Sequence, residues 1–338
     1  MLTLVTGAGG FVGSQVVQEC LASAQPVRAL LRDPDKAGGL RARGVEVLAG
    51  DIRDAGAVTA AMRGVDVVYH CAAAVGPQYS RGEIYETNLL GVRRVLEALR
   101  QVGRGKLVLL SSINVLGTRH LDHATEDLPC RRSGDPAADV KIEAERMALE
   151  YQRRHGVTLT ILRPGFIYGP GDTRNLPKLV EAVRRGRFAY IGSRHHVVPI
   201  VHVQDVVRAM LLAAGAAASD GRIYHITDGS RTTIGELVDL LADLVGCPRP
   251  RRVLPYWVPR AACTVSEWLG RMHLRRGPAR ITRASLRFLG TSRSVDIGRA
   301  TEELGYHPGV SYREGVAATL QSLKEQARGQ ADVALYPT

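Results

Sequence analysis

Short apolar runs alternate with helical patterns over the first half of the chain. The runs that predict buried strands are 2–6, 27–31, 45–49, 67–70, 107–110 and 158–162. Between them, segments such as 13–23, 87–102 and 139–155 carry apolar residues at helical spacing. Strands that alternate with helices predict an α/β fold with a doubly wound parallel sheet, and near-continuous apolar strands suit a sheet covered on both faces.

The pattern changes after residue 165, where glycine, proline and basic residues become frequent. Helical patterns recur at 176–185, 203–217, 233–245, 257–273, 297–304 and 312–327. We therefore expect a Rossmann-type sheet domain over residues 1–165 and a smaller C-terminal substrate-binding region over 166–328. This region would be interleaved with the end of the sheet, and residues 329–338 would form a loose tail.

A glycine-rich turn, TGAGGFVG at residues 6–13, follows the first predicted strand and opens a helix. Gly7 permits the tight turn, Gly10 lets backbone approach a pyrophosphate, and Gly13 lets the helix pack closely on the strand. The helix N-terminus would face the anion. The strand before and the helix after this turn predict a dinucleotide site, with Phe11 and Val12 beside the cofactor.

The end of the second strand selects the cofactor. An NAD site usually has an acid there to hold the ribose 2′-hydroxyl, but the chain has Leu31 followed by Arg32. A guanidinium can hold a 2′-phosphate through two hydrogen bonds and stack on adenine. We therefore expect NADP(H), with Arg32 as the main contact and Lys36 as a second one, while Asp33 leaves NAD open.

Charge and composition bear on whether the protein binds nucleic acid or a membrane. The formal charge is +12, but no nucleic-acid-binding motif accompanies the basic residues. We expect the charge to attract anionic ligands rather than nucleic acid. No apolar run approaches the roughly 20 residues that span a bilayer, and no targeting segment precedes the first strand, so we expect a cytoplasmic protein without a membrane partner.

The cysteines give no sign of a metal or redox centre. The five of them are scattered, and none forms a C-x-x-C pair. We expect reduced cysteines and no bound metal.

Six further motifs carry a family resemblance. They are GDIRD at 50–54, HCAA at 70–73, SSINVLG at 111–117, LRPGFIYGPGD at 162–172, VHVQDV at 201–206 and VDIGRATEELGY at 295–306. Together with the glycine-rich turn, their order over residues 1–325 resembles the extended short-chain dehydrogenases/reductases, the NAD-dependent epimerase/dehydratase type.

The resemblance implies further cofactor contacts. They would come from Asp51, Ile52, Ala72, Ala73 and Pro164. Asp51 would accept a hydrogen bond from the adenine amino group, or alternatively would only close the turn before residue 54. Asn88 would brace the site from the helix after the fourth strand.

The family's catalytic acid is missing. Related enzymes protonate the carbonyl oxygen from the tyrosine of Tyr-x-x-x-Lys, whose lysine lowers the tyrosine pKa and holds the ribose. Here Ser112 and Lys141 stand at the family positions, but Ala137 replaces the tyrosine, and Pro136 at the helix start fixes the register. Alternatively, Lys141 would be a surface lysine and Ser112 a serine satisfied by local backbone.

Three functions remain open. The first is an NADPH-dependent ketoreductase of a bulky, aromatic polyketide-type carbonyl, whose proton comes from a hydroxyl on the substrate; angucyclinone-type ketoreductases resemble the chain in lacking the tyrosine. The second is a reductase or dehydrogenase of sterol-like or sugar-nucleotide substrates with a substitute acid among Tyr79, Tyr168, His120, His195 and His196. The third is a non-catalytic NADP(H)-sensing or scaffold protein.

The substrate pocket should open beyond the carboxyl ends of the strands. Its walls would come from residues 75–79, 168–175, a hairpin at 188–199, and 255–274. The last of these, rich in apolar residues, is either a lid over a flat substrate or a helix packed on the core.

Overall fold

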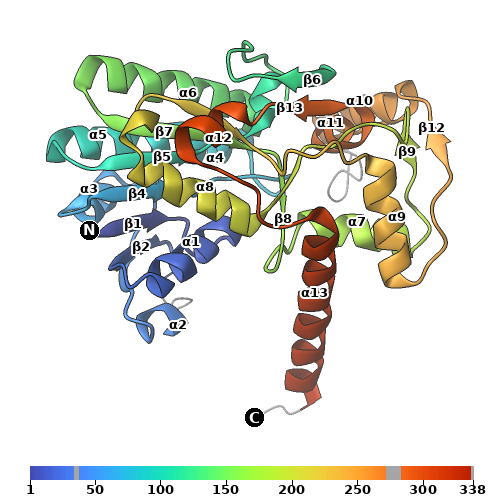
Figure 1. Cartoon of the computed structure of the whole chain (residues 1–338), viewed down its shortest axis with the longest axis horizontal. Helices are drawn as coiled ribbons and strands as arrows, with labels where there is room; N and C mark the ends of the chain where they lie inside the picture. Colours follow the sequence, from blue (N-terminus) through green and yellow to red (C-terminus); the bar gives the residue numbers. More distant parts are fainter. Residues whose placement is uncertain (34–37, 272–282, 336–338) are drawn as a thin grey trace.

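The computed structural model describes residues 1–33, 38–271 and 283–335 (Figure 1). Its main sheet is parallel and has the strand order β11-β7-β5-β4-β1-β2-β3. The strands are β1 (Thr3–Thr6), β2 (Val27–Leu31), β3 (Glu46–Ala49), β4 (Val67–His70), β5 (Lys106–Leu110), β7 (Thr158–Pro164) and β11 (Ile223–Ile226). The predicted doubly wound sheet is confirmed, and the order reverses between β1 and β4, where such sheets bind ligands.

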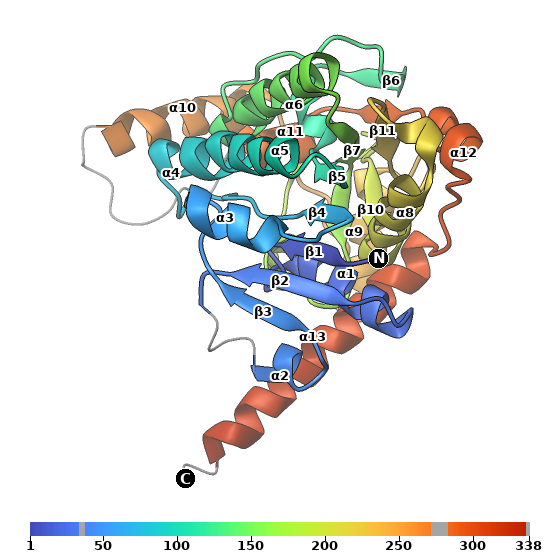
Figure 2. The same ribbon diagram turned by 90° about the vertical axis from the view of Figure 1, so that its left-hand side faces the viewer.

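Helices cover both faces of this sheet. On one face lie α1 (Phe11–Ala22) and α8 (Val203–Gly215), and on the other α3 (Ala55–Met62), α5 (Gly91–Val102) and α6 (Pro136–His155) (Figure 2). Successive residues of β1 serve the two cores, because strand side chains alternate in direction. Val5 packs in the apolar cluster with α1 and α8, and Leu4 in the cluster with α3 and α5.

A second group of elements extends the molecule beyond the carboxyl ends of the strands. Its core is a third apolar cluster that joins Tyr168, Val183 and Leu237. The elements are β8 (Phe166–Tyr168), α7 (Asn175–Arg184), β9 (Tyr190–Ile191), β10 (Ile200–His202), α9 (Ile234–Val245), β12 (Val253–Leu254), α10 (Trp257–Arg271), α11 (Arg283–Gly290) and α13 (Tyr312–Leu335).

Short elements complete the chain. They are α2 (Gly38–Arg41), α4 (Arg81–Tyr85), the π-helical turn η2 (Glu86–Leu90), the 3-10 helices η3 (Ile113–Leu116) and η4 (Ala217–Ser219), β6 (Leu121–Ala124), β13 (Arg293–Val295) and α12 (Gly298–Leu304). β6 pairs with β13, although about half of the chain separates them in sequence.

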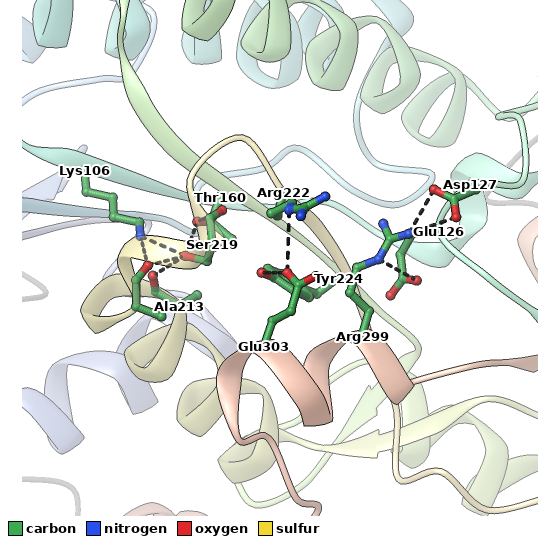
Figure 3. Close-up of polar contacts among 11 residues, drawn as sticks. Lys106, Glu126, Asp127, Thr160, Ala213, Ser219, Arg222, Tyr224, Arg299 and Glu303 are labelled. Carbon is green, nitrogen blue, oxygen red and sulfur yellow. Dashed lines mark hydrogen bonds and ion pairs between the residues drawn. The ribbon is translucent and has the colours of Figure 1, made fainter.

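Strand β11, which the sequence pattern did not predict, is fixed to the sheet by buried polar contacts (Figure 3). Lys106 of β5 donates to the carbonyl oxygen of Ala216 at 2.7 Å and to Ser219 Oγ at 2.8 Å. The Tyr224 hydroxyl of β11 donates to Glu303 of α12 at 2.7 Å. These contacts come from segments that are distant in the sequence. The strand at 223–226 therefore cannot be recognised from its local sequence pattern alone.

The expected loose tail is partly wrong. Helix α13 continues to Leu335, so residues 329–335 are helical. No proline interrupts the segment before Pro337, and alanine, glutamine and leucine favour helix. Both views show this helix leading away from the rest of the molecule (Figures 1 and 2). Within the described ranges, no helix has the length and apolar character that a membrane span needs.

Candidate active site

The glycine-rich turn joins β1 to α1 at the point where the strand order reverses. Gly7 has φ +71, and a Cβ atom there would lie 2.7 Å from the backbone nitrogen of Ala72, so the residue needs both the conformation and the small size of glycine. A Cβ atom on Gly13 would lie 2.2 Å from the Gly7 carbonyl oxygen. Gly10 is the N-cap of α1 and no side chain caps this helix end. The cradle therefore fits the pyrophosphate of a dinucleotide.

Other residues predicted to border the cofactor are Phe11, Val12, Ala72, Ala73 and Pro164. Val12 is buried and Phe11 half-buried, and Gly171 lies beside the Phe11 ring. Ala72 follows β4, and its N–H lies 3.5 Å from Thr6 Oγ1. Ala73 is exposed beyond it, and Pro164 is the buried last residue of β7.

Arg32 and Asp51 lie together at the end of β2 and β3. The Asp51 carboxylate accepts from the Arg53 N–H at 2.8 Å and from the Arg53 guanidinium at 2.7 Å. The hydrogen bond from the Arg53 side chain is the main cause that lowers the Asp51 pKa, and the charge of exposed Arg32 adds to it. Asp51 thus orders its own turn, while Asp54 caps α3. Lys36 lies outside the described residues.

Asn88 braces the loop after β4. Its Oδ1 accepts from the Ala74 N–H at 2.7 Å, and its Nδ2 donates to the Ala74 carbonyl oxygen at 3.0 Å. It lies in the π-helical turn η2, a local geometry that is frequent at functional sites. Buried Ile52 lies next to this helix, because a Cβ on Gly91 would come within 3.2 Å of it.

Ser112 follows β5, and Lys141 lies on α6. Ser112 is the N-cap of η3, and its Oγ accepts from the Asn114 N–H at 3.2 Å, which leaves its O–H free to donate. Lys141 Nζ donates to the Leu110 carbonyl oxygen at 2.6 Å. Burial lowers the Lys141 pKa to about 8.

Ala137 lies in the first turn of α6, at the position where the family resemblance places a tyrosine. Pro136 is the first residue of the helix, and Asp135 caps it by accepting from the Ala137 N–H at 3.0 Å. Asp139 is not a substitute acid at this place, because its carboxylate accepts from the N–H groups of Ser133 at 2.7 Å and Gly134 at 2.9 Å. Ala137 itself is half-buried and ends at Cβ.

A buried network that the sequence analysis missed lies directly behind Ser112. Ser111 donates to Glu145 with 2.5 Å between Oγ and Oε1, and Arg163 binds Glu145 at 2.7 Å, with both charged side chains almost fully buried. Cys130 Sγ accepts from Arg163 at 3.2 Å. The ion pair ties α6 to β7 and fixes the backbone that carries Ser112. Arg163 belongs to the motif at 162–172, but its pairing with Glu145 becomes evident only from their positions in the structure.

A small cavity of about 10 Å³, roughly one water in size, lies between β4, β5 and α6. Its wall includes His70, Asn88, Ser111 and Lys141. His70 Nδ1 lies 3.0 Å from Thr6 Oγ1, and burial lowers its pKa to about 3. Burial raises the pKa of adjacent Cys71 to about 12. At neutral pH the imidazole and the thiol are therefore uncharged, and Lys141 is the cation beside them.

The candidate substitute acids lie on several different elements. Tyr168 is in the third apolar cluster, edge-on to His202, and His195 is exposed in a turn. His196 lies 5.6 Å from His120, between ring centroids, and 3.3 Å from the Leu289 carbonyl oxygen. Tyr79 is half-buried in the loop after β4.

The expected pocket walls contact one another. Arg174 donates to the Val75 carbonyl oxygen at 3.1 Å, which joins residues 75–79 to 168–175. Residues 188–199 do not form a hairpin: β9 pairs in parallel with β12 instead. Tyr256 and Cys263 pack with Ile191, so part of 255–274 is packed on the core, while Trp257 is 70 % exposed. Residues 272–274 lie outside the described ranges.

Residues 3–227 match the model of the NAD dependent epimerase/dehydratase family, and the chain belongs to this family. A ketoreductase of 4-hydroxy-2-methyl-3-oxo-4-farnesyl-3,4-dihydroquinoline-1-oxide from Stigmatella aurantiaca is 30% identical over 95% of the chain and 96% of its own length. Sterol demethylase protein B from Methylococcus capsulatus is 31% identical over 91% and 94%. The dTDP-glucose 4,6-dehydratase DesIV from Streptomyces venezuelae, solved with NAD, has a TM-score of 0.77 at 28% identity, covering 98% of each chain. The family and these relatives indicate an oxidoreductase.

Proposed function

We propose that the chain is an NADPH-dependent ketoreductase of a bulky, aromatic polyketide-type carbonyl. It works without a tyrosine, and the proton for the carbonyl oxygen comes from a hydroxyl group beside the ketone on the substrate. The observation that carries this proposal is Ala137 at the acid position, together with intact Ser112 and Lys141. Decay of a disused active site would not be expected to spare the serine, the lysine and the whole glycine cradle.

Three roles follow for the chain's own residues. The cradle at Gly7 and Gly13 binds the pyrophosphate, and Lys141 holds the nicotinamide ribose. Ser112 donates its O–H to the carbonyl oxygen while its Oγ accepts from the Asn114 N–H. Bound NADPH supplies a hydride, and a hydroxyl hydrogen-bonded to the ketone supplies the proton that Ala137 cannot give.

The choice of NADPH rests on Arg32. It is exposed where β2 ends, close enough to Asp51 to influence the pKa of that carboxyl, and Leu31 replaces the acid that NAD sites favour. A 2′-phosphate placed there would meet a guanidinium rather than a carboxylate.

The Stigmatella relative supports the substrate class. Its name places a hydroxyl at position 4 next to an oxo group at position 3 of a bulky fused ring. Position 4 also carries the farnesyl group and is saturated, so that hydroxyl is an alcohol rather than a phenol, and the relative supports only a bulky fused-ring ketone as the substrate. The sterol relative keeps a second candidate, a reductase or dehydrogenase of sterol-like substrates with its own acid.

The test is NADPH consumption with paired aromatic ketones, of which one has a free hydroxyl beside the ketone and the other its methyl ether. NADH runs alongside. We expect turnover of the hydroxylated member with NADPH. Equal turnover of both members would reject the substrate-supplied proton, and turnover of a sterol ketone alone would favour the second candidate.

A further inference from the structure

Helix α6 presents Ala137 and Lys141 one turn apart. Residues at this spacing share a helix face. Ala137 is the second residue of the helix and half-buried, and its backbone is fixed by the Asp135 cap and by Pro136. The helix thus keeps the register of a tyrosine-bearing site while the side chain stops at Cβ.

The titratable groups near Lys141 lie at the end of β4 and on α6 itself. His70 is the last residue of β4 and Cys71 follows it, and both are uncharged at neutral pH because of burial. Glu145 lies one turn further along α6, but Arg163 neutralises it at 2.7 Å. Among the described residues that line the small cavity, Lys141 carries a positive charge that no ion pair offsets, since its ammonium donates to the Leu110 carbonyl oxygen.

We propose that a hydroxyaryl ring of the substrate lies beside Ala137, where related enzymes have a tyrosine ring, with its hydroxyl between the ketone oxygen and Lys141. This inference rests on the proposed function and makes Ala137 a specificity-determining residue. The truncated side chain is then a requirement for the substrate rather than a loss, since a tyrosine ring and the substrate ring need the same place.

The proton balance closes through Lys141. Hydride transfer forms the new C–H bond, and the electron pair of the carbonyl π bond moves to oxygen, which takes the proton of the ring hydroxyl. The phenolate left behind faces the Lys141 ammonium, which transfers a proton to it. Lys141 regains its proton from solvent, so that the overall reaction consumes one hydride and one solvent proton.

The pKa and the charge of Lys141 suit the two functions proposed for it, which are proton transfer to the phenolate and electrostatic stabilisation of that phenolate. A lysine buried next to neutral groups has a pKa near neutrality, as its value of about 8 indicates, and it can release a proton more readily than an exposed lysine. As an ammonium, it stabilises an adjacent phenolate in a site where few other charges compete.

The test uses three ligands and three variants of the full chain. The ligands are a tetralone with its hydroxyl in the peri position, the methyl ether of that compound, and plain tetralone. Ala137→Phe introduces a ring without an acid, Ala137→Tyr a ring with one, and Ala218→Phe serves as the control at an exposed position outside the site. The first readout is the affinity of each ligand for the NADP⁺-loaded protein. For the peri-hydroxy ligand, the absorbance of its phenol and phenolate forms also reports its ionisation state.

We expect the wild type and Ala218→Phe to bind the peri-hydroxy ligand and to shift its ionisation to lower pH. Ala137→Phe and Ala137→Tyr should weaken this binding by about tenfold or more, because the introduced ring occupies the place of the ligand ring. A tenfold loss of affinity corresponds to about 1.4 kcal/mol of binding free energy. Ala137→Tyr alone should gain reduction of plain tetralone, because its hydroxyl lies next to Lys141. Circular dichroism and NADPH binding establish that each variant is folded.

Unchanged binding of the peri-hydroxy ligand by Ala137→Phe would overturn the inference, and so would a failure of the wild type to bind it. Failure of the proposed function looks different. In that case the ligand binds as described and depends on Ala137, but the wild type reduces none of the ketones with NADPH.

Discussion

The Lys141 ammonium donates to the Leu110 carbonyl oxygen at 2.6 Å, so the lysine of α6 is held at the end of β5, directly before Ser111 and Ser112. This contact places the Lys141 cation next to the segment that carries Ser112, the serine proposed to bind the carbonyl oxygen. It also explains why Lys141 is buried, because its stem runs across the helix–sheet interface and its charge is satisfied by a backbone oxygen.

The first prediction concerns pH. Burial lowers the Lys141 pKa from 10.5 to about 8, so the ammonium is present below that pH and is lost as the pH rises through it. We expect NADPH affinity to fall across this range, and Lys141→Met to bind NADPH about tenfold more weakly, since a hydrogen bond from a charged group contributes about 1.5 kcal/mol or more. Fluorescence titration across the range measures both.

Exposed Lys324 provides the control, and Lys324→Met should leave the profile unchanged. The lowered pKa also predicts that the free energy of unfolding increases as the pH rises from about 8 to 10.5, because the unfolded chain binds more protons than the folded one in this range. A wild-type affinity that is flat across pH 8 would contradict the assignment of Lys141 to the ribose.

The second prediction concerns cofactor choice. Arg32→Ala should raise KM for NADPH roughly tenfold to a hundredfold, because it removes a charge-assisted, two-bond contact to the 2′-phosphate. KM for NADH should change by less than about twofold. Initial rates with both cofactors give the ratio, and Arg43→Ala, at an exposed position on the surface, is the matched control. Equal loss with both cofactors would assign Arg32 a structural role.

The third prediction concerns the buried pair behind Ser112. Arg163→Met leaves Glu145 charged and almost fully buried, and should cost about 3–5 kcal/mol of unfolding free energy. The double change Glu145→Met with Arg163→Met should recover part of this loss. Urea unfolding measures both variants.

Glu181 and Arg184 supply the comparison on the surface, where their side chains are 40% and 62% exposed. Glu181→Gln should cost less than about 1 kcal/mol. Similar costs at the two places would mean that the buried network does not stabilise the site as described.

The fourth prediction concerns the cradle. Gly13→Ala places a Cβ against the Gly7 carbonyl oxygen, so either the turn or α1 must shift. We expect loss of measurable NADPH binding and destabilisation of about 2–4 kcal/mol. Gly39→Ala, where a Cβ meets nothing within 4 Å, is the control and should bind NADPH normally. Normal binding by Gly13→Ala would place the cofactor elsewhere.

Much of the fold could be predicted from local patterns. The six runs that predicted strands coincide with β1 to β5 and β7, because a strand covered on both faces is apolar along its length. β11 was missed, since Tyr224 and His225 interrupt its apolar run and its place depends on polar contacts to α12 and β6. The end of α13 was missed because residues 329–335 are mostly small or polar and show no clear apolar spacing.

Part of the candidate site could be predicted from the sequence, and part could not. The glycine cradle was predicted from its spacing between a strand and a helix, while Ser112, Lys141 and the missing acid at Ala137 were assigned by the family resemblance. The Ser111, Glu145 and Arg163 network does not, because its members come from three elements and are paired only through the packing of α6 on the sheet. The Arg53 contact to Asp51 was likewise hidden, although the two residues are neighbours in the sequence.

The most direct test of the account is a single-turnover measurement of hydride transfer. Protein saturated with NADPH is mixed with the peri-hydroxy ketone or with its methyl ether, and NADPH absorbance is followed in time, so that differences in cofactor binding do not contribute. The account predicts hydride transfer at least about a hundredfold faster to the hydroxylated ketone, as for the loss of a general acid. Equal rates for the two ketones would contradict a proton supplied by the substrate and would require an acid within the protein.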